Sequence, residues 1–261
     1  SFITMKNNMI NEEFEHQEQL KRVSRHLSIL YEISNAMRTT LELKQILYII
    51  LTGVTAHTGL GFNRAALFLI NTKERTLEGQ MGIGPESGEH ADAIWSYIAK
   101  VKPPLEELID TYKMAKTEQS PFHVAITKIK IPLNKELSGL MGRVYQEGAP
   151  IIVQDSSPSS LKPNDPLRRI FQNGELVVMP LKAKDKVNGL IVADNLFTKR
   201  PITDDDLKIF TMLANQAGLA IENSRLFEMV VHKSHTDSLT TLWNHGYFQD
   251  TLLAEFTKAK E

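Results

Sequence analysis

The chain has 261 residues, of which 42% are hydrophobic, a formal net charge of −1 and no cysteine. This length suits one large or two small domains with a real core, and the charge gives no electrostatic footprint for nucleic acid. The lack of cysteine excludes disulfides, thiol nucleophiles and cysteine-ligated metal sites.

Two helices are predicted at the N-terminal end. The first is a polar helix over 9–37 that breaks near 35–40, and the second is an amphipathic helix over 43–58 that ends at Gly59 and Gly61. The first helix carries a row of residues at alternating steps of three and four: Leu20, Val23, Leu27, Leu30, Ser34 and Met37. Such a row is typical of a helix that packs along one side.

The middle of the chain is predicted to mix short strands with helices. We expect strands at 64–70, 76–81, 122–131, 151–153, 176–183 and 187–193, and helices at 86–100, 105–116 and 137–147. The stretch 156–166 contains three prolines and four serines and is predicted to be a loop.

The central strands are apolar on both faces. In the strand at 64–70, for example, Leu67 and Leu69 alternate with Phe68 and Ile70. A sheet that is apolar on both sides must be covered on both sides, which predicts an α+β protein built as an α/β/α sandwich around an antiparallel sheet. We expect the first, second and last helices over one face, and a roof of helices 86–100 and 137–147 with the loop 156–166 over the other.

A long last helix is predicted to begin near Asp204, because Thr203 can cap it and the acidic residues that follow favour the positive end of its dipole. Two neighbouring rows run along this helix. The first row is Phe210, Leu213, Ala217, Ala220, Ser224, Phe227 and Val231, and the second is Ile209, Met212, Gln216, Leu219, Asn223, Leu226 and Val230. One row is expected to pack on the helix's own domain and the other to face a partner helix; the alternative is one broad intramolecular face. The predicted dimer and signalling residues are Leu20, Leu27, Leu30, Phe210, Leu213, Ala217, Ala220, Phe227 and Val231.

The last helix runs into the sequence Asp-Ser-Leu-Thr-Thr-Leu-Trp-Asn-His-Gly-Tyr-Phe at 237–248. This segment resembles the opening of the GGDEF family, the diguanylate cyclases, which usually read D-x-L-T-G-L-x-N-R-R-x-F. The matching residues are Asp237, Leu239, Thr240, Leu242, Asn244 and Phe248, whereas Thr241, His245 and Gly246 depart from the pattern. Thirteen residues follow Phe248, and the Gly-Gly-acidic-acidic-Phe signature occurs nowhere in the chain. The resemblance implies that this chain is no cyclase by itself, that GTP serves only the missing domain, and that a longer parent is a diguanylate cyclase.

The segments 139–155, 186–195, 202–207 and 213–227 resemble parts of a GAF domain. The resemblance extends back to about Leu27 and covers roughly 200 of the 261 residues. It implies a GAF- or PAS-like sheet that holds a small molecule under the roof. Without cysteine, a thioether-linked bilin and the cysteine-dependent methionine sulfoxide reductase activity of some GAF proteins are excluded. Ile202 stands where GAF domains that bind cyclic nucleotides typically have Phe.

Three parts of the chain follow from these resemblances. We expect an N-terminal signalling helix over 1–26, a GAF sensor domain over 27–230, and a linker with the truncated start of a GGDEF domain over 231–261. The longest strongly apolar stretch, 46–51, is far shorter than a membrane span, and no signal peptide is visible, so a cytoplasmic location is expected.

The resemblance to GAF domains places the ligand pocket between the sheet and its roof. The candidate pocket residues are Arg64, Phe68, Trp95, His123, Arg143, Asp155, Arg168 and Asp194. Six of them have a plainer alternative: Trp95 in roof packing, the three arginines as solvated charges and the two aspartates in turns. No metal site is expected, because no second histidine lies at helical or hairpin spacing from His123.

The sequence therefore predicts a homodimeric sensor that passes a rearrangement to a cyclase domain through its helical flanks. The alternative is a structural dimerisation module whose GAF pocket is packed shut. An intrinsic enzyme is disfavoured, because no nucleophile, metal cluster or coupled acid–base pair is recognisable. The ligand stays open between haem, cyclic nucleotides, small organic acids and none.

Overall fold

The fold was analysed in a computed structural model of the chain. The structure describes residues 2–57, 59–85, 87–101, 103–134, 139–154, 161, 164–171, 174–235, 240, 242, 244, 247–249, 251, 252 and 255. None of the helices within this part is both long and apolar enough to cross a membrane.

The centre of the molecule is a six-stranded antiparallel sheet, as the sequence predicts. In chain order its strands are β1 (Arg64–Asn71), β2 (Thr76–Ile83), β3 (Lys130–Pro132), β4 (Ile151–Val153), β5 (Leu176–Ala183) and β6 (Lys186–Asp194). Across the sheet they lie in the order β3-β2-β1-β6-β5-β4. The central pair β1 and β6 is in register with Arg64 opposite Asp194 and Leu69 opposite Gly189.

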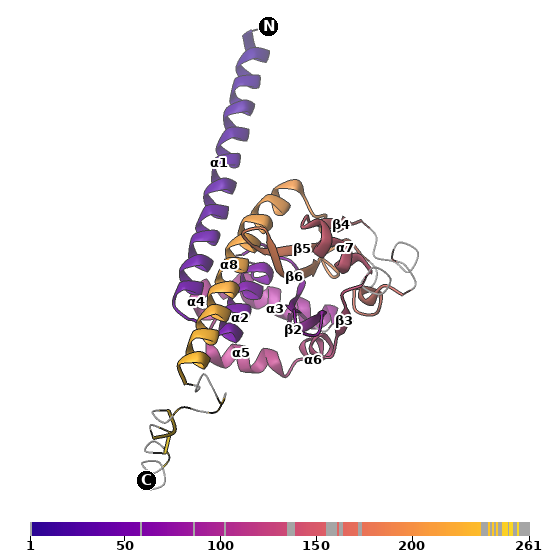
Figure 1. The fold of residues 1–261 in the computed structure, drawn as a ribbon. Helices are drawn as coiled ribbons and strands as arrows, with labels where there is room; N and C mark the ends of the chain where they lie inside the picture. The colour runs from indigo at the N-terminus through magenta and orange to yellow at the C-terminus, as the bar shows by residue number, and fades with distance from the viewer. Residues whose placement is uncertain are drawn as a thin grey trace.

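The two faces of the sheet bury two separate apolar cores, which confirms the predicted α/β/α layering. On one face, alternate residues such as Leu67 and Ile191 pack against α1 (Phe2–Arg38), α2 (Leu43–Thr55) and α8 (Asp204–His235). On the other face, Phe68 and Val192 pack against residues of α6 (Pro121–Thr127), α7 (Gly139–Glu147) and the 3₁₀ helix η1 (Pro166–Arg169). Figure 1 shows α1 and α8 running side by side along the first face.

The roof over the second face differs from the prediction. Helix α3 (Gly88–Val101) contributes no described side chain to either core, so α6 and the residues around η1 take the place expected for it. The segment expected as a helix over 105–116 is divided into α4 (Leu105–Leu108) and α5 (Thr111–Glu118). Of the loop at 156–166, residues 156–160, 162 and 163 lie outside the described residues.

The strand predicted over 122–131 is wrong for its first part, which forms α6. Ser120 caps this helix by accepting a hydrogen bond from the backbone N–H of His123 at 3.1 Å, and Pro121 occupies its first position. Pro at that position is pre-organised for a helix, and the capping oxygen satisfies an otherwise unpaired donor. Phe122 and Ile126 are then buried at helical spacing, which alternation alone could not reveal.

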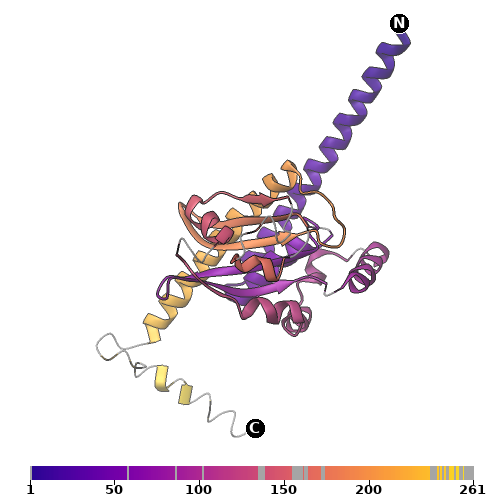
Figure 2. The same ribbon diagram turned by 90° about the vertical axis from the view of Figure 1, so that its right-hand side faces the viewer.

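The two long helices extend beyond the domain at opposite ends. Both views show α1 projecting away at the N-terminal end and α8 leaving at the C-terminal end (Figures 1 and 2). The start of α8 agrees with the prediction: Thr203 Oγ1 accepts from the Asp206 N–H at 3.2 Å, while Asp206 Oδ2 accepts from the Thr203 N–H at 2.9 Å. This reciprocal cap fixes where the helix begins.

Candidate functional site

Arg64 and Asp194, two of the predicted pocket residues, pair with each other. The register of β1 and β6 sets them opposite one another, although they are 130 residues apart in sequence. Arg64 Nε lies 3.2 Å from both carboxylate oxygens of Asp194, and its Nη2 donates to Oδ2. Both residues are buried, so this is a desolvated ion pair whose two members depend on each other.

Two aromatic rings enclose the Arg64 guanidinium. Its central carbon lies 5.2 Å from the ring centroid of Phe122 and 5.3 Å from that of Phe171, both within cation–π range. The guanidinium also donates to the carbonyl of Ile170 at 3.4 Å. The side chain is thus engaged by its own chain on several sides.

His123 lies on the same face, at the start of α6. His123 Nδ1 accepts a hydrogen bond from the Gly82 N–H at 3.5 Å. Burial lowers the pKa of His123; Lys44 lowers it further, whereas Glu118 raises it. Lys44 Nζ is paired with Glu118 Oε1 at 2.6 Å, so this carboxylate already has a cationic partner. An uncharged His123 fits this surrounding.

Of the predicted pocket residues, the structure pairs Arg64 with Asp194, buries Phe68 in the core of the same face and sets His123 against the Gly82 N–H. Arg143 is exposed on α7 and pairs with Glu147 at 3.0 Å, because the helix turns Met141 and Val144 toward the sheet instead. Its pocket role is therefore corrected to a surface one. Arg168 is half-buried in η1, while Asp155 and the side chain of Trp95 lie outside the described residues.

Sequence reasoning missed Asp165, a buried carboxylate that ties the roof together. Its Oδ2 accepts from the Leu140 N–H at 2.8 Å and its Oδ1 from the Leu167 N–H at 2.9 Å. It therefore caps η1 and fastens the start of α7 at the same time. The Asp-Pro pair at 165–166 was the available signal, since this is a typical capping sequence before a short helix.

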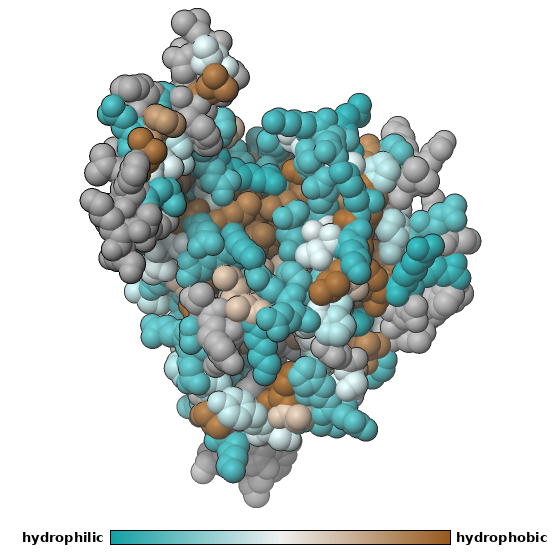
Figure 3. All heavy atoms as spheres, turned by 90° about the horizontal axis from the view of Figure 1, so that it is seen from below, coloured by the Kyte–Doolittle hydropathy of each residue, from teal (hydrophilic) through white to brown (hydrophobic). Residues whose placement is uncertain are grey.

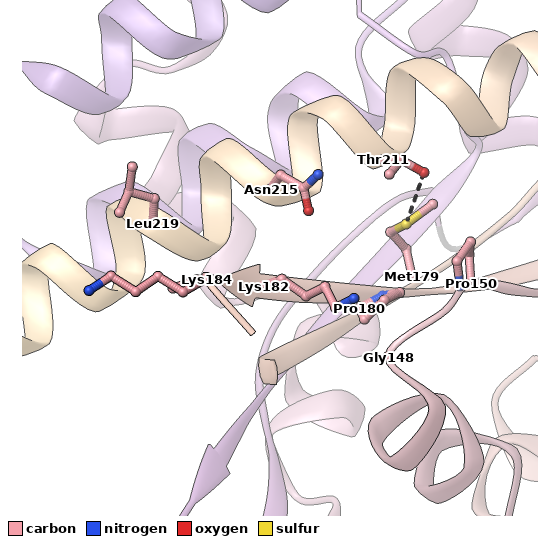
Figure 4. A pocket seen from close by; sticks show the side chains of 10 residues that line it. Gly148, Pro150, Met179, Pro180, Lys182, Lys184, Thr211, Asn215 and Leu219 are labelled. Carbon is pink, nitrogen blue, oxygen red and sulfur yellow. Dashed lines mark hydrogen bonds between the residues drawn. The ribbon is translucent and has the colours of Figure 1, made fainter. Parts of the chain in front are cut away.

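An open groove follows the outer edge of β5, on the other side of the domain (Figure 4). It has a volume of about 470 Å³ and lies between α8, which contributes Thr211, Asn215 and Leu219, and the segment Gly148 to Pro150. Strand β4 pairs only with Leu176 to Val178, so within the described part of the chain β5 has no strand partner beyond them on this side. Pro180, which lacks an N–H, and Lys182 lie on that edge and disfavour pairing with another strand.

The groove also shows how closely α8 is seated on the sheet. Gly218 faces the backbone of Lys182, and a Cβ at this position would lie 2.1 Å from the Lys182 carbonyl oxygen. Thr211 Oγ1, two turns earlier, contacts Met179 Sδ at 3.7 Å (Figure 4). The helix therefore lies directly on β5, a contact that a glycine permits.

The two rows of α8 have different surroundings. Phe210, Leu213 and Ala217 are fully buried in the domain's own core, so their predicted place in a dimer seam is wrong. Leu30 of α1 is likewise a core residue. Of the remaining seam residues, Ala220 and Val231 are partly buried, whereas Leu20, Leu27 and Phe227 are exposed.

Apart from Ile209, which is buried in the core, the second row is exposed. Met212, Leu219, Leu226 and Val230 are 48%, 53%, 47% and 64% exposed, and α1 exposes Leu20, Val23, Leu27 and Tyr31. Figure 3 looks at the end of the domain from which α8 emerges and shows apolar side chains between hydrophilic ones. Ser34 Oγ of α1 donates to Gln216 Oε1 of α8, which joins the two helices.

The motif after α8 is only partly described. Asp237 and Leu239 lie outside the described residues, while Leu242 and Phe248 are 69% and 58% exposed. Asn244 Nδ2 donates to the Ser234 carbonyl at 2.6 Å, and its Oδ1 accepts from the Tyr247 N–H at 2.9 Å. Thr240 is exposed. Among the described residues, no group of three or more His, Asp or Glu is arranged to hold a metal ion.

The family model for the GAF domain matches residues 42–221, which is more than half of the chain. The chain belongs to the GAF domain family.

Solved structures with the same fold are related only distantly in sequence. A GAF domain from an Acinetobacter phosphoenolpyruvate-protein phosphotransferase is 14% identical with a TM-score of 0.53, covering 77% of this chain and 94% of that one. The corresponding domain from Coxiella burnetii is 14% identical with a TM-score of 0.53, covering 79% and 98%. Residues 122 to 287 of a methyl-accepting chemotaxis protein are 16% identical with a TM-score of 0.52, covering 75% and 98%. At these identities the likeness shows the fold alone.

Proposed function

We propose that this GAF domain is the sensor of a homodimeric signalling protein and controls a C-terminal diguanylate cyclase domain through α8. The observation that carries the proposal is the division of α8 into two faces. One face belongs to the core of the sensor, the other is exposed and apolar, and the same helix leads toward the GGDEF-like motif at 237–248. A change in the sensor can therefore alter how two copies of the helix meet.

A second copy of the chain is the partner that suits the exposed row. Met212, Leu219 and Leu226 recur every seven residues, which is the period of a coiled-coil seam. The positions between them hold Gln216 and Asn223, so the row carries no charge that would be buried unpaired against itself. A polar residue such as Asn at a seam position favours a matching Asn opposite it, which fixes register.

The geometry of the two long helices favours a parallel pair. Helices α1 and α8 run in the same direction, and each extends beyond the domain at its own end (Figure 1). In a parallel dimer, the exposed apolar residues of each projecting segment meet their counterparts. An antiparallel pair would instead bring the projecting segment of α1 to the same end as that of α8, and Gln216 and Asn223 could not both face their own counterparts.

A small-molecule ligand in the pocket is part of the proposal, and its site would be the face around Arg64. The alternative is a dimerisation module with a closed pocket, and one observation favours it: Arg64 is already engaged by Asp194, Phe122 and Phe171. Native mass spectrometry of the purified chain separates the two. A co-purifying molecule that is lost on Arg64→Met supports a ligand, and its absence supports the closed module.

The link from sensor to cyclase is tested by insertions after Val231, in a protein that carries the complete cyclase domain. Each inserted residue turns the following segment by about 100° if the helix is continuous. Seven residues restore the phase of the seam, four leave it half a residue out, and two or five shift it strongly. We expect regulation to be preserved best with seven, less with four, and least with two or five. Equal activity across the series would contradict a rigid helical link.

A further inference from the structure

Helix α8 leaves the domain within a single turn. Ile221 and Ser224 are fully buried, whereas Leu226, Phe227, Met229 and Val230 are 47%, 47%, 53% and 64% exposed. Whatever fixes the orientation of the projecting segment must therefore act at about residues 222–225.

Three side chains of this turn are hydrogen-bonded to three different parts of the domain. Glu222 Oε2 accepts from Asn188 Nδ2 of β6 at 2.9 Å. Ser224 Oγ donates to the carbonyl of Leu41, in the link between α1 and α2, at 2.7 Å. Arg225 Nη2 donates to the carbonyl of Ile70 in β1 at 3.3 Å.

These contacts lie in a desolvated surrounding, where a lost hydrogen bond is costly. Asn188 and Ser224 are 1% and 0% exposed. Burial lowers the pKa of Arg225, while the neighbouring carboxylates Glu222 and Glu228 raise it. Removing one member leaves its partner buried without a hydrogen bond. The free-energy cost of that unpaired group is larger than the net stabilisation that the hydrogen bond contributed.

The strands that hold this turn are the same two that hold the candidate pocket. Strand β1 has Arg64 at its first residue and Ile70 near its last. Strand β6 has Asn188 near its first residue and Asp194 at its last. The two central strands therefore run from the Arg64–Asp194 ion pair to the point where α8 leaves, a path of roughly 20 Å for six residues of strand.

We propose that Asn188, Glu222, Ser224 and Arg225 form an exit clamp, which fixes the rotation of α8 and couples it to the Arg64–Asp194 pair through β1 and β6. That this coupling transmits a signal rests on the proposed signalling function. The clamp itself lies within one copy of the chain and does not depend on dimerisation. A shift of either central strand changes the clamp on one side of α8 only, and so turns the helix rather than merely loosening it.

Hydrogen exchange of the full chain tests the clamp. Ser224→Ala and Arg225→Met should speed amide exchange over 226–235 by about fivefold and at least tenfold respectively, because a hydrogen bond from a charged donor contributes more. Amides of β1 and β6 should keep their protection. Glu222→Gln, which still accepts from Asn188, should exchange like the original chain. Unchanged exchange over 226–235, or equal acceleration in the strands, would overturn the clamp.

Arg200→Met is the matched control. Arg200 also holds α8 through its guanidinium, but at the start of the helix, with Nη1 at 2.9 Å from Asp206 Oδ2 and Nη2 donating to the Leu60 carbonyl at 3.3 Å. It should leave exchange over 226–235 unchanged. An effect there as large as that of Arg225→Met would show general loosening of the helix and overturn the clamp.

The coupling along the strands has its own test in Asp194→Asn. This change should alter exchange over 226–235 by severalfold in the original background and have no further effect once Arg225→Met has opened the clamp. Equal effects in both backgrounds, or none in either, would overturn the coupling. Light scattering on the same samples reports on the proposed dimer separately: a monomer would contradict the dimer and leave the clamp standing.

Discussion

Replacing Gly218 by alanine should lower stability, although helix propensity alone predicts the reverse. Alanine favours a helix over glycine by about 0.8–1.0 kcal/mol. The new Cβ, however, would lie 2.1, 2.5 and 2.6 Å from the backbone O, C and N of Lys182. The Lys182 backbone is held by its pairing with Val187 of β6, so α8 must move away by about 1 Å to restore ordinary contact.

That movement determines the magnitude. Overpacking of this kind costs typically about 1–3 kcal/mol, and a gap of 0.5–1 Å along the buried row forfeits a quarter to a half of the dispersion attraction there. After the gain in propensity we expect a net loss of about 1–2 kcal/mol, which lowers Tm by about 2–8 °C for a domain of this size.

The assay is thermal unfolding followed by circular dichroism, with Gly88→Ala as control. Gly88 is also helical, as the first residue of α3, but a Cβ there meets nothing within 4 Å, so this variant should be as stable as the original or slightly more so. If Gly218→Ala melts at or above the original temperature, the close seating of α8 on β5 is refuted.

Three further predictions concern the seam, the buried ion pair and pH. Leu219 and Leu226 are 53% and 47% exposed, so replacing both with glutamate should disrupt the dimer and leave Tm unchanged. Light scattering should then report a monomer, and a persisting dimer would place the interface elsewhere. Arg64→Met should lower the free energy of unfolding by about 3–5 kcal/mol in denaturant unfolding, because it leaves Asp194 buried and unpaired. The double variant Arg64→Met with Asp194→Leu should lose less. A larger loss in the double variant would contradict this reasoning. Because burial lowers the pKa of His123 below its ordinary 6.5, the unfolded state binds the proton first, so the free energy of unfolding should fall as pH drops below about 6.5. His123→Gln should reduce that fall between pH 7 and 5.5, and identical pH dependence would exclude this role for His123.

The layered architecture could be predicted because it rests on short-range patterns. Strands β5 and β6 alternate apolar side chains on both faces across a tight turn, and that pattern alone requires cover on both sides. The start of α8 could be predicted equally well, since Thr203 and Asp206 cap the helix through hydrogen bonds within one turn of chain. Helix α6 could not be predicted, because a seven-residue apolar segment fits either a strand or a helix. The cap at Ser120 determines that it forms a helix.

The candidate site was harder to predict because its contacts are tertiary. The meeting of Arg64 with Asp194 depends on the register of strands far apart in sequence, and Phe171 reaches the same guanidinium from a third segment. For α8 the sequence offered two apolar rows and no reliable choice of the buried one. The polar residues Gln216 and Asn223 in the second row were the available signal that this row is exposed.

Disulfide cross-linking of single-cysteine variants tests the central claim, that two copies meet through the second row of α8, most directly. The chain has no cysteine, so any cross-link reports the introduced position alone. In a parallel dimer, Asn223→Cys, Leu226→Cys and Val230→Cys should cross-link readily, since facing seam positions come within disulfide reach of each other. Glu228→Cys, exposed on the opposite side of the same helix, should cross-link slowly. Cross-linking of Glu228→Cys as fast as that of the seam variants, or no cross-linking at any of the four positions, would contradict the account.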